Sequence, residues 1–448
     1  MTTFAGSRVL VVGLGSSGFA AAKALLSRDA KVRVTESAKT SAIEARAATL
    51  RQLGAEVEVG EHDYSRLDAD LAIVSPGIAP STPVVQALVS SGVEIWSEVE
   101  LAFRVAKCDF LAVTGTNGKT TTTSLLAAML RAGGIESIAA GNIGLPLVDA
   151  VTSVPEGGAV AVEVSSFQLA TTVRFHPKVA VLLNIAEDHT DWHGSLEAYA
   201  AAKARIVENQ DASDAFVVNA DESLVMEIAD RAPSRVVQFS ATSLPDAPDS
   251  IGVTDGAVTW KGRRVFGLDS VPLPGRGGAE DAIAAAGAAL EYGVAIHAVA
   301  DALQSFQPLP HRLQLVAQVG GVSYIDDSKA TNPHATLAAV TGLDRVVLIA
   351  GGRSKNIDLA PLAGAVPPVE AVVALGEAAG EVEKVFEGLV PVQRAASMSE
   401  AMQLASAAAS PGGSVLLSPG CASLDMYESY AARGDAFARA VHELSAGE

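Results

Sequence analysis

A lysine and a threonine after a glycine-containing turn are the first residues of the chain that could do phosphate chemistry. The segment "AVTGTNGKTTTTSLLAAML", residues 112–130, begins as an apolar strand, turns through "GTNG" (115–118) and continues as a helix. Glycines let backbone N–H groups converge on phosphate oxygens at a helix start, where Lys119 can neutralise phosphates and Thr120 can reach Mg²⁺. The segment therefore predicts nucleotide binding and leaves the reaction open.

The glycine spacing of this turn departs from the common phosphate-binding loop. In the pattern GxxxxGK, a glycine stands six positions before the lysine, but here that position is Val113. The turn could also be a plain strand–turn–helix connection whose glycines only permit the bend. A Gly-Lys-Thr sequence that opens a helix directly after an apolar strand favours a phosphate site over that simpler interpretation.

A second glycine pattern lies nearer the start of the sequence. Gly13, Gly15 and Gly18 follow an apolar run in G-x-G-x-x-G spacing, and Glu36 ends the next apolar run. This pattern is typical of a turn that receives a pyrophosphate, with the acidic residue on a sugar hydroxyl. It fits a nicotinamide cofactor, and it fits a nucleotide-linked substrate as well. We favour the substrate, because a redox role would make the loop at 115–120 redundant.

Possible metal ligands follow the phosphate loop. Glu163 ends the apolar run "GAVAVE", where its carboxylate could bind Mg²⁺, which prefers oxygen ligands. The segment 184–206 adds Asp188, His189, Asp191, His193 and Lys203. Taken singly, these are ordinary surface, capping or strand-end residues. Beside a phosphate loop they indicate a phosphoryl-transfer site in which two metal ions bridge the transferring oxygens.

The elements that must position these residues read as α/β units. Apolar, strand-like runs alternate with alanine-rich helical stretches through most of the chain, which is the pattern of parallel sheets covered by helices. Between residues 215 and 274 we expect shorter strands separated by turns. Two helices are expected at about 280–292 and 296–305. The proline-rich segment "QPLPHR", 307–312, is expected to be a hinge.

The sequence predicts three α/β domains. They are an N-terminal Rossmann-like domain over residues 1–107, a central domain with a P-loop ATPase-like parallel sheet over 108–308, and a C-terminal Rossmann-like domain over 309–448. A chain of 448 residues is too long for one ordinary core, which supports this division.

The overall composition argues against several classes of protein. Apolar residues make up 49% of the chain, with 40 glycines and 20 prolines, which is typical of a globular protein. The formal charge of −19 argues against nucleic acid or an anionic membrane as the main partner. No uninterrupted apolar run reaches the ~20 residues of a spanning helix, so we expect no membrane insertion. Two cysteines, Cys108 and Cys421, and a start without a signal-peptide pattern predict a cytoplasmic protein.

A series of short motifs, spread over essentially the whole chain, carries a resemblance to a known family. They are "GLGSSG" (13–18), "SPGI" (75–78), "TGTNGKTTT" (114–122), "GNIG" (141–144), "EVSSFQL" (163–169), "EDH" (187–189), "PHR" (310–312), "DDSKATN" (326–332), "GGRSKN" (351–356) and "LSPGCASLD" (417–425). Each motif is weak alone. In this order and spacing the chain resembles the Mur ligases, and among them the branch that adds D-glutamate to UDP-N-acetylmuramoyl-L-alanine.

The resemblance implies an ATP-dependent amide ligase of peptidoglycan precursor synthesis, and through that pathway a role in cell shape and division. The reaction would pass through an acyl phosphate and release ADP and phosphate. ATP and two Mg²⁺ ions would be the cofactors, UDP-N-acetylmuramoyl-L-alanine and D-glutamate the partners, and the protein a cytoplasmic monomer. Three substrates must meet, so the domains are expected to close about the hinge.

The resemblance also implies a role for individual residues. The ATP-binding set would be Gly115, Thr116, Asn117, Gly118, Lys119, Thr120 and Thr121 in the loop, with Arg312 and Asp327 at the adenine-ribose end. Metal ligands would be Thr120, Glu163, His189 and Lys203, the last as a carbamate. Lys119, His189 and Lys203 would be catalytic, and either His189 or the carbamylated Lys203 would take the proton from the attacking amine.

The substrate-binding residues implied by the resemblance fall into three groups. The UDP end would contact Gly15, Ser16, Ser17, Glu36, Ser75 and Gly77. The muramoyl-alanine end would contact Asn142 and Ser165. D-glutamate would lie near Lys329, Thr331, Lys355, Ser423 and Tyr430.

The chain departs from the family pattern at several positions. Family members often carry a His-Asn pair and a later Asn where this chain has Gly277, Gly278 and Asp281, in a segment that helps to hold the adenine. Tyr430 stands where Phe is common, and Trp192 where Arg is common. None of these changes removes a group that phosphoryl transfer needs.

Two alternative interpretations remain open at this point. The first is a sibling ligase that adds L-alanine or a diamino acid, or a folylpolyglutamate synthase; "EVSSFQL", "DDSKATN" and "SPGCASLD" favour the D-glutamate branch over these. The second is a nicotinamide-dependent dehydrogenase or a non-catalytic nucleotide sensor, for which tight NAD(P)H binding without ATP turnover would be the evidence.

Overall fold

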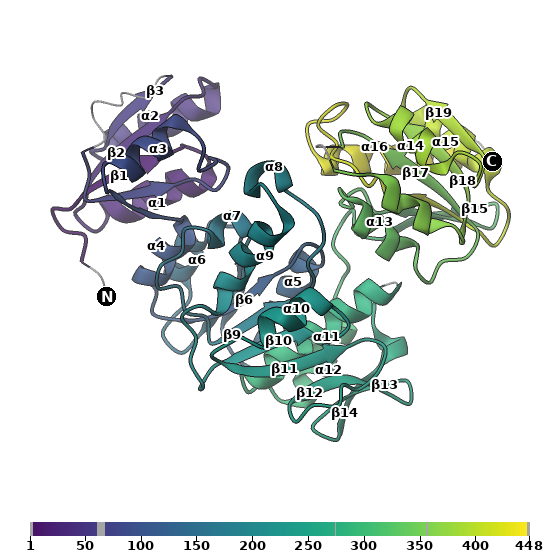
Figure 1. The fold of residues 1–448 in the computed structure, drawn as a ribbon, viewed down its shortest axis with the longest axis horizontal. Helices are drawn as coiled ribbons and strands as arrows, with labels where there is room; N and C mark the ends of the chain where they lie inside the picture. Colours follow the sequence, from purple (N-terminus) through teal and green to yellow (C-terminus); the bar gives the residue numbers. More distant parts are fainter. Residues whose placement is uncertain (1–2, 61–67, 274, 355–356, 446–448) are drawn as a thin grey trace. The chain divides into compact units, whose positions relative to one another are not determined.

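A computed structural model describes residues 3–60, 68–273, 275–354 and 357–445 (Figure 1). It contains three β-sheets, whose strands lie within residues 8–96, 109–267 and 314–417. The α/β class expected from the sequence is confirmed. The boundaries expected at residues 107 and 308 fall between consecutive sheets and stay predictions. In the described part of the chain, no helix has the length and apolar character needed to cross a membrane.

Two compact units make up the chain. The first consists of residues 1–185, 197–266 and 282–303 and holds the first sheet and nearly all of the second. The other unit consists of residues 186–196, 267–281 and 304–448 and holds the third sheet.

The first sheet is parallel throughout, in the order β3-β2-β1-β4-β5. The elements of this part are β1 (Arg8–Val12), α1 (Ser16–Leu26), β2 (Lys31–Glu36), α2 (Ser41–Gln52), β3 (Glu56–Val59), β4 (Leu71–Val74), α3 (Pro83–Ser90), β5 (Glu94–Trp96) and α4 (Glu98–Val105). The strand order reverses between β1 and β4, and ligands of such sheets bind outside the carboxyl ends of the strands at this point. The glycine turn after β1 and Glu36 at the end of β2 both lie there.

Gly18 shows why the turn after β1 needs glycine. A Cβ atom at this position of α1 would lie 2.0 Å from the carbonyl oxygen of Gly13, so the helix could not begin so close to the strand. Close packing of the first helix on the strand is the role that the third glycine of this pattern has.

The second sheet has the order β14-β13-β12-β11-β10-β9-β6-β8-β7. Its strands and helices are β6 (Asp109–Thr114), α5 (Lys119–Ala132), β7 (Ser137–Gly141), α6 (Leu147–Ser153), β8 (Ala159–Glu163), α7 (Ser166–Leu169), β9 (Val179–Leu182), α8 (Thr190–His193), α9 (Leu196–Ala204), η2 (Arg205–Val207), β10 (Ala215–Asn219), α10 (Ser223–Ala229), β11 (Arg235–Ser240), β12 (Ser250–Thr254), β13 (Ala257–Trp260), β14 (Arg263–Gly267), η3 (Leu268–Ser270), α11 (Gly275–Glu291) and α12 (Ile296–Ser305).

The core strands of this sheet are β8, β9 and β10, in which every residue is buried. Continuous apolar runs of this kind are typical of parallel strands covered on both faces. The strands from β7 to β12 are parallel, and β13 pairs antiparallel with β12 at the far edge, in the region where shorter, turn-separated strands were expected. The parallel strands therefore present their carboxyl ends at one edge.

The third sheet has the order β15-β16-β20-β17-β18-β19, with β15 antiparallel to the others. Its strands and helices are β15 (Gln314–Val319), β16 (Val322–Asp326), α13 (Pro333–Val340), β17 (Val346–Gly351), η4 (Ala360–Ala365), β18 (Val369–Leu375), α14 (Ala379–Phe386), β19 (Val392–Ala395), α15 (Met398–Ala408), β20 (Ser414–Leu417) and α16 (Tyr430–Ser445). Alternate residues of β17 enter two separate cores: Leu348 packs in one and Val347 and Ile349 in the other. Both faces of this sheet are thus covered.

Candidate active site

The predicted phosphate loop connects β6 to α5. Gly118 adopts a left-handed conformation, with φ of +81°, directly before the first residue of the helix. The Lys119 ammonium group folds back over the loop and donates hydrogen bonds to the carbonyl oxygens of Gly115 (2.9 Å) and Thr116 (2.7 Å). The helix start and the ammonium group therefore lie at the same end of the loop, which is the arrangement that a phosphate group needs.

Asn184 fixes the conformation of this loop from the neighbouring strand. It follows β9, and its side-chain Oδ1 accepts hydrogen bonds from the backbone N–H groups of Thr116 (3.0 Å) and Asn117 (2.8 Å). The Thr116 N–H group is also 3.0 Å from the Asn184 carbonyl oxygen. The loop is thus held by the sheet as well as by its own glycines. The sequence did not single out this asparagine.

Lys203 lies beside the phosphate loop and is 1% exposed. Its amine donates a hydrogen bond of 2.7 Å to the carbonyl oxygen of Gly115, the same oxygen that Lys119 contacts. The amine also lies 4.5 Å from the centre of the Tyr199 ring, whose hydroxyl group is 3.2 Å from Thr116 Oγ1. Lys203 of α9 is therefore a buried residue that contacts the phosphate loop, and it is not a surface lysine.

Glu163 ends β8 and is 2% exposed. One carboxylate oxygen accepts a hydrogen bond of 2.8 Å from the side-chain amide of Asn142. The other oxygen is buried and makes no hydrogen bond. Because β8 lies next to β6 and is parallel to it, this carboxylate lies at the same edge of the sheet as the phosphate loop. Buried polar atoms almost always have partners, so this oxygen fits the oxygen ligand of a cation.

Other predicted residues of the central sheet have structural partners. Ser165 caps α7 in a capping box with Gln168, whose backbone N–H and side chain both bond to it. Thr121 is buried at 5% exposed, and Thr120 is half-buried at the helix start. His189 lies in the other compact unit, in a left-handed conformation with φ of +54°, and its backbone N–H donates to Asp188 Oδ1 at 2.9 Å.

A cavity of about 530 Å³ opens at the carboxyl edge of the first sheet. Gly15, Glu36, Ser75 and Gly77 line it, so four of the six residues predicted for the UDP end are brought together. The Glu36 carboxylate is held in the turn by hydrogen bonds from the backbone N–H groups of Leu14 (2.7 Å) and Ala38 (2.8 Å). The volume is typical of small-ligand sites.

Asp327 and Arg312 lie together at the start of the third sheet. Asp327 accepts hydrogen bonds from the Ser418 hydroxyl (2.9 Å) and from the backbone N–H of Leu313 (3.3 Å), next to Arg312. Burial raises the pKa of Asp327 to about 7, against which the hydrogen bonds and the nearby Arg312 charge act. The two residues predicted for the adenine-ribose end are therefore neighbours.

The residues predicted to receive D-glutamate follow the strands of the third sheet. The Lys329 ammonium group lies 3.9 Å from the centre of the Tyr430 ring, which is a cation–π contact. Ser423 is buried after β20, and Thr331 is half-buried after β16. Lys355 lies outside the described residues.

Of the two glycines that stand where family members often carry a His-Asn pair, Gly278 has a local explanation. A Cβ atom at Gly278 would lie 2.5 Å from the Leu273 Cβ and 2.9 Å from the Leu273 carbonyl oxygen. A larger residue would require the segment before α11 to move. Gly277 has more room, since the first atom that a Cβ would meet is the Ala338 Cβ at 3.9 Å.

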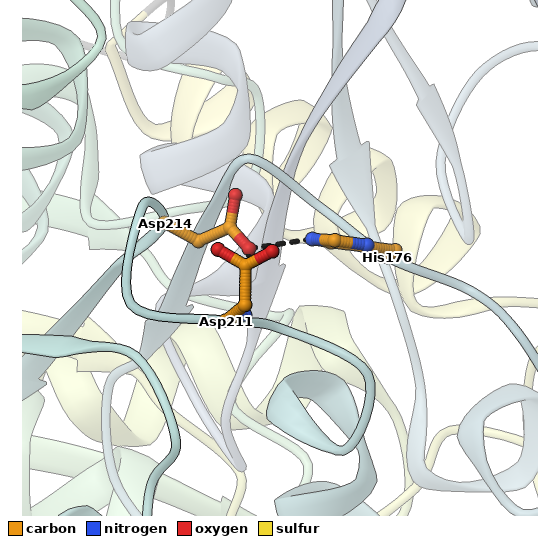
Figure 2. Close-up of side chains that lie close together, drawn as sticks. All are labelled: His176, Asp211 and Asp214. Carbon is orange, nitrogen blue, oxygen red and sulfur yellow. Dashed lines mark hydrogen bonds and ion pairs between the residues drawn. The ribbon is translucent and has the colours of Figure 1, made fainter.

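Three further possible metal ligands lie together at the other edge of the second sheet. Figure 2 shows His176, Asp211 and Asp214, whose ligand atoms all lie within 4.8 Å of one another. The atoms already have partners: Asp214 accepts from His176 Nε2 (2.5 Å) and from the Asp211 N–H (2.8 Å), and Lys178 lies 3.3 Å from its second oxygen. These contacts close the turn before β10, and nothing at this cluster points to a bound cation.

Models of three protein families match the chain in succession. Residues 7–97 match the Mur ligase MurD-like N-terminal domain, residues 113–289 the Mur ligase middle domain, and residues 311–421 the Mur ligase glutamate ligase domain.

Curated relatives match the chain at nearly full length. A protein of Frankia casuarinae named UDP-N-acetylmuramoylalanine--D-glutamate ligase is 43% identical over 447 residues, which covers 98% of this chain and 94% of that protein. A protein of Geobacillus kaustophilus with the same name is 40% identical over 443 residues, covering 98% of each.

Solved structures share the three-domain α/β fold. MurC, the UDP-N-acetylmuramate-alanine ligase of Thermotoga maritima, matches with a TM-score of 0.60 at 20% identity, covering 99% of this chain and 100% of that one. The MurF ligase of the same organism, solved in complex with ADP, matches with a TM-score of 0.60 at 14% identity over the same shares of the two chains. At these identities the likeness concerns the fold alone.

Proposed function

Because this chain belongs to the Mur ligase family, we propose that it joins D-glutamate to UDP-N-acetylmuramoyl-L-alanine with the hydrolysis of ATP to ADP and phosphate. The observation that carries this proposal is the identity of about 40%, over nearly full length, to relatives named for that reaction. The phosphate loop, the buried Glu163 and the nucleotide-sized cavity of the first sheet support it. Acting on peptidoglycan precursors, the protein would work in the cytoplasm and contribute to cell shape and division.

The chemistry requires activation of a carboxylate. The terminal carboxylate of the alanyl group attacks the γ-phosphorus of ATP, ADP leaves, and an acyl phosphate forms. The amine of D-glutamate then attacks the acyl carbon, loses a proton, and expels inorganic phosphate as the amide bond forms. Lys119 would stabilise the charge of the transferring phosphoryl group, which is the role of a lysine at the start of a P-loop helix.

The residues at the second sheet fit a magnesium ion. The second oxygen of Glu163 supports this fit, because it is buried and has no hydrogen-bond partner that a cation would have to displace. Glu163 and Thr120 would hold the cation, with His189 and a carbamate on Lys203 as further ligands. When bound, Mg²⁺ would offset the charge of the phosphate oxygens. Glu163 itself would be oriented by the hydrogen bond from Asn142.

Carbamylation would turn Lys203 from a cation into an anion. Its neutral amine would attack CO₂ and release a proton. The carbamate that forms would add two oxygen ligands at the buried end of α9. The placement of the amine, 2.7 Å from the Gly115 carbonyl oxygen and 1% exposed, supports a role at the phosphate loop. Intact mass and activity would then respond to bicarbonate.

The three substrates would take separate parts of the chain. The cavity lined by Gly15, Glu36 and Ser75 would hold the UDP group. Arg312 and Asp327 would bind the ribose end of ATP, and the loops after β16 and β20 would receive D-glutamate. Asn142 would meet the muramoyl-alanine end. The Ser165 hydroxyl accepts from the Gln168 N–H and donates to Gln168 Oε1, so one acceptor lone pair remains for a ligand.

An amino-acid panel tests the proposal. The purified chain is given ATP, Mg²⁺ and UDP-N-acetylmuramoyl-L-alanine with D-glutamate, L-glutamate, L-alanine, meso-diaminopimelate or L-lysine, and phosphate release is followed. Of the five amino acids, only D-glutamate is expected to support phosphate release. Mass spectrometry should then detect the amide product. Turnover with L-alanine in the presence of UDP-N-acetylmuramate, or with a diamino acid only, would sink the proposal. Tight NAD(P)H binding without ATP turnover would point to the redox alternative.

A further inference from the structure

Arg433 is a fully buried cation that the proposed reaction does not use. It lies in the first turn of α16, and 2% of it is exposed. Its guanidinium group makes four hydrogen bonds: Nε donates to the Ser328 hydroxyl (3.0 Å), one terminal nitrogen to the Ser328 carbonyl oxygen (2.8 Å), and the other to the carbonyl oxygens of Cys421 (3.1 Å) and Gly351 (3.5 Å). One side chain therefore contacts three separate segments.

The three segments leave neighbouring strands of the third sheet. Ser328 follows β16, Cys421 follows β20 and Gly351 ends β17. These strands are adjacent and parallel in the order β16-β20-β17, so their loops leave the same edge. That edge is where ligands of parallel α/β sheets bind. Arg433 thus lies directly behind the edge at which a ligand of this domain would sit.

The surroundings of Arg433 are shaped to hold it. The Ser328 hydroxyl donates to the Tyr430 carbonyl oxygen (2.7 Å), which ties the loop to the start of the same helix. Gly352 leaves the space for the guanidinium group, because a Cβ there would lie 3.1 Å from an Arg433 terminal nitrogen and 2.3 Å from the Ala422 carbonyl oxygen. A planar group with five donors suits this set of acceptors, and a lysine cannot span it.

The charge of Arg433 is not balanced by a direct ion pair. All four of its hydrogen bonds go to neutral oxygens, and within the described part of the chain no carboxylate oxygen lies within 4.0 Å of it. Burial lowers the pKa of Arg433 to about 10, while Asp425 and Asp326 attract the charge from farther away. A buried cation with neutral partners costs free energy, which a purely structural hydrogen-bond donor would avoid.

We propose that Arg433 is a positioning residue for the dicarboxylic amino acid: it holds the loops after β16 and β20 and the end of β17 in one arrangement, and its unbalanced charge favours an anionic ligand at their edge. The inference rests on the proposed function, since those loops carry Lys329, Ser423 and the start of α16 at Tyr430. Arg433 does not touch the ligand. It acts through the backbone of Ser328, Cys421 and Gly351.

The test separates binding of the amino acid from binding of the other substrates. The variants Arg433→Lys and Arg433→Met are assayed by phosphate release, with KM measured for D-glutamate, ATP and UDP-N-acetylmuramoyl-L-alanine. We expect KM for D-glutamate to rise about tenfold or more, the size expected from losing several charge-assisted hydrogen bonds. KM for UDP-N-acetylmuramoyl-L-alanine, whose UDP group would bind at the first sheet, should change less than about twofold, and Lys should restore part of the loss seen with Met because it keeps the charge.

A matched control and a milder variant complete the experiment. Arg439→Met changes an exposed arginine of the same helix and should leave all three KM values unchanged. Should the Arg433 variants not fold, Ser328→Ala tests the same bridge, because it removes only the hydroxyl between Arg433 Nε and the Tyr430 carbonyl oxygen. It should raise KM for D-glutamate about two- to fivefold, the size expected from one hydrogen bond.

The outcomes separate this inference from the proposed function. Wild-type turnover with D-glutamate, together with an unchanged KM for D-glutamate in the Arg433 and Ser328 variants, overturns the inference alone. An equal rise of all three KM values also overturns it, since that is the effect of general loosening. No wild-type turnover with D-glutamate overturns both.

Discussion

The carboxyl edges of the second and third sheets use buried charges in different ways. At the second sheet, the Lys119 ammonium group rests on loop carbonyl oxygens and Glu163 keeps one buried oxygen without a hydrogen bond. At the third sheet, Arg433 and Asp327 are also buried, but backbone and hydroxyl groups of the loops occupy their polar atoms. On the proposed function, the edge of the second sheet would present its charged groups to a ligand, whereas at the third sheet the buried charges hold the loops.

This difference predicts which substitutions should lower turnover alone and which should also lower stability. Groups that face a ligand contribute to turnover, and their loss should leave the folded protein as stable as before or more so. Groups that hold loops contribute to stability and to ligand affinity together. The following experiments test the contrast, beginning with the largest expected effect.

Lys119→Ala should lower kcat by about three orders of magnitude, because charge stabilisation of a transferring phosphoryl group is commonly worth several kcal/mol. The melting temperature should stay within about 2 °C of wild type, since the loop carbonyl oxygens that the ammonium group contacts can bind water instead. Phosphate release and a thermal melt provide the two measurements. Lys178→Ala, a lysine at the opposite edge of the same sheet, is the control and should keep full turnover. A variant that loses stability along with activity would contradict the contrast.

Glu163→Gln should lower kcat by about two orders of magnitude and leave the thermal stability unchanged or raised. The activity falls because an amide is a poor Mg²⁺ ligand. The stability holds because the variant removes a buried charge whose second oxygen has no hydrogen bond, while the first oxygen can still accept from Asn142. A titration of Mg²⁺ in the assay should show a weaker apparent affinity; an unaltered magnesium dependence would argue against this residue as a ligand.

Asp327→Asn should change the pH dependence of stability in the third sheet. Burial raises the pKa of Asp327 from 3.8 to about 7, so the folded state keeps its proton after the unfolded state has lost it. The stability that this proton provides is present below about pH 4 and is lost as the pH rises to about 7. Between pH 5 and pH 8 the wild type should therefore lose about 2.5 kcal/mol more than the variant, at about 1.36 kcal/mol per pKa unit.

Hydrogen exchange of the β16 amides at the two pH values measures this loss locally, which avoids assuming that the whole chain unfolds in one step. Asparagine keeps an acceptor for Leu313 N–H and a donor for Ser418, so folding should survive. An equal difference between wild type and variant at both pH values would show that Asp327 is not protonated in the folded state.

Tyr430→Phe should have the smallest effect, with KM for D-glutamate within about twofold of wild type. The ring face that Lys329 covers is kept, and only the hydroxyl is lost. Tyr430→Leu removes the ring and should raise that KM about threefold, the size of an exposed cation–π contact. Steady-state kinetics on the pair give the comparison, and a Phe variant as impaired as the Leu variant would assign the contribution to the hydroxyl group.

The sequence predicted best those features that lie close together along the chain. The phosphate loop, Glu163 at a strand end and the glycine turn after β1 each follow from a strand and the residues next to it. The helices expected at 280–292 and 296–305 correspond to α11 and α12. Local patterns of this kind do not depend on how distant segments meet.

Residues that hydrogen-bond to distant strands or loops could not be predicted from the sequence. Asn184 holds the loop from 67 residues away, and Arg433 reaches Ser328 across 105 residues. An asparagine after an apolar run or an arginine in a helix gives no signal of such a contact, because the strand order of the sheet decides it. For Ser165 the family resemblance implied a ligand contact, which stays a prediction, while the structure shows a local role that the sequence analysis did not mention, the cap of α7.

The hydrogen bonds from Asn184 change what the phosphate loop can offer a nucleotide. Two N–H groups, those of Thr116 and Asn117, point to the sheet before any nucleotide arrives. The N–H groups from Gly118 to Thr121 precede the first hydrogen bond along the helix, which Thr122 donates to the Gly118 carbonyl oxygen, so this stretch is the one that can face phosphate oxygens. The cradle is therefore short and lies at the helix start. A glycine at position 113 would add nothing to it, and Val113 can remain a fully buried strand residue.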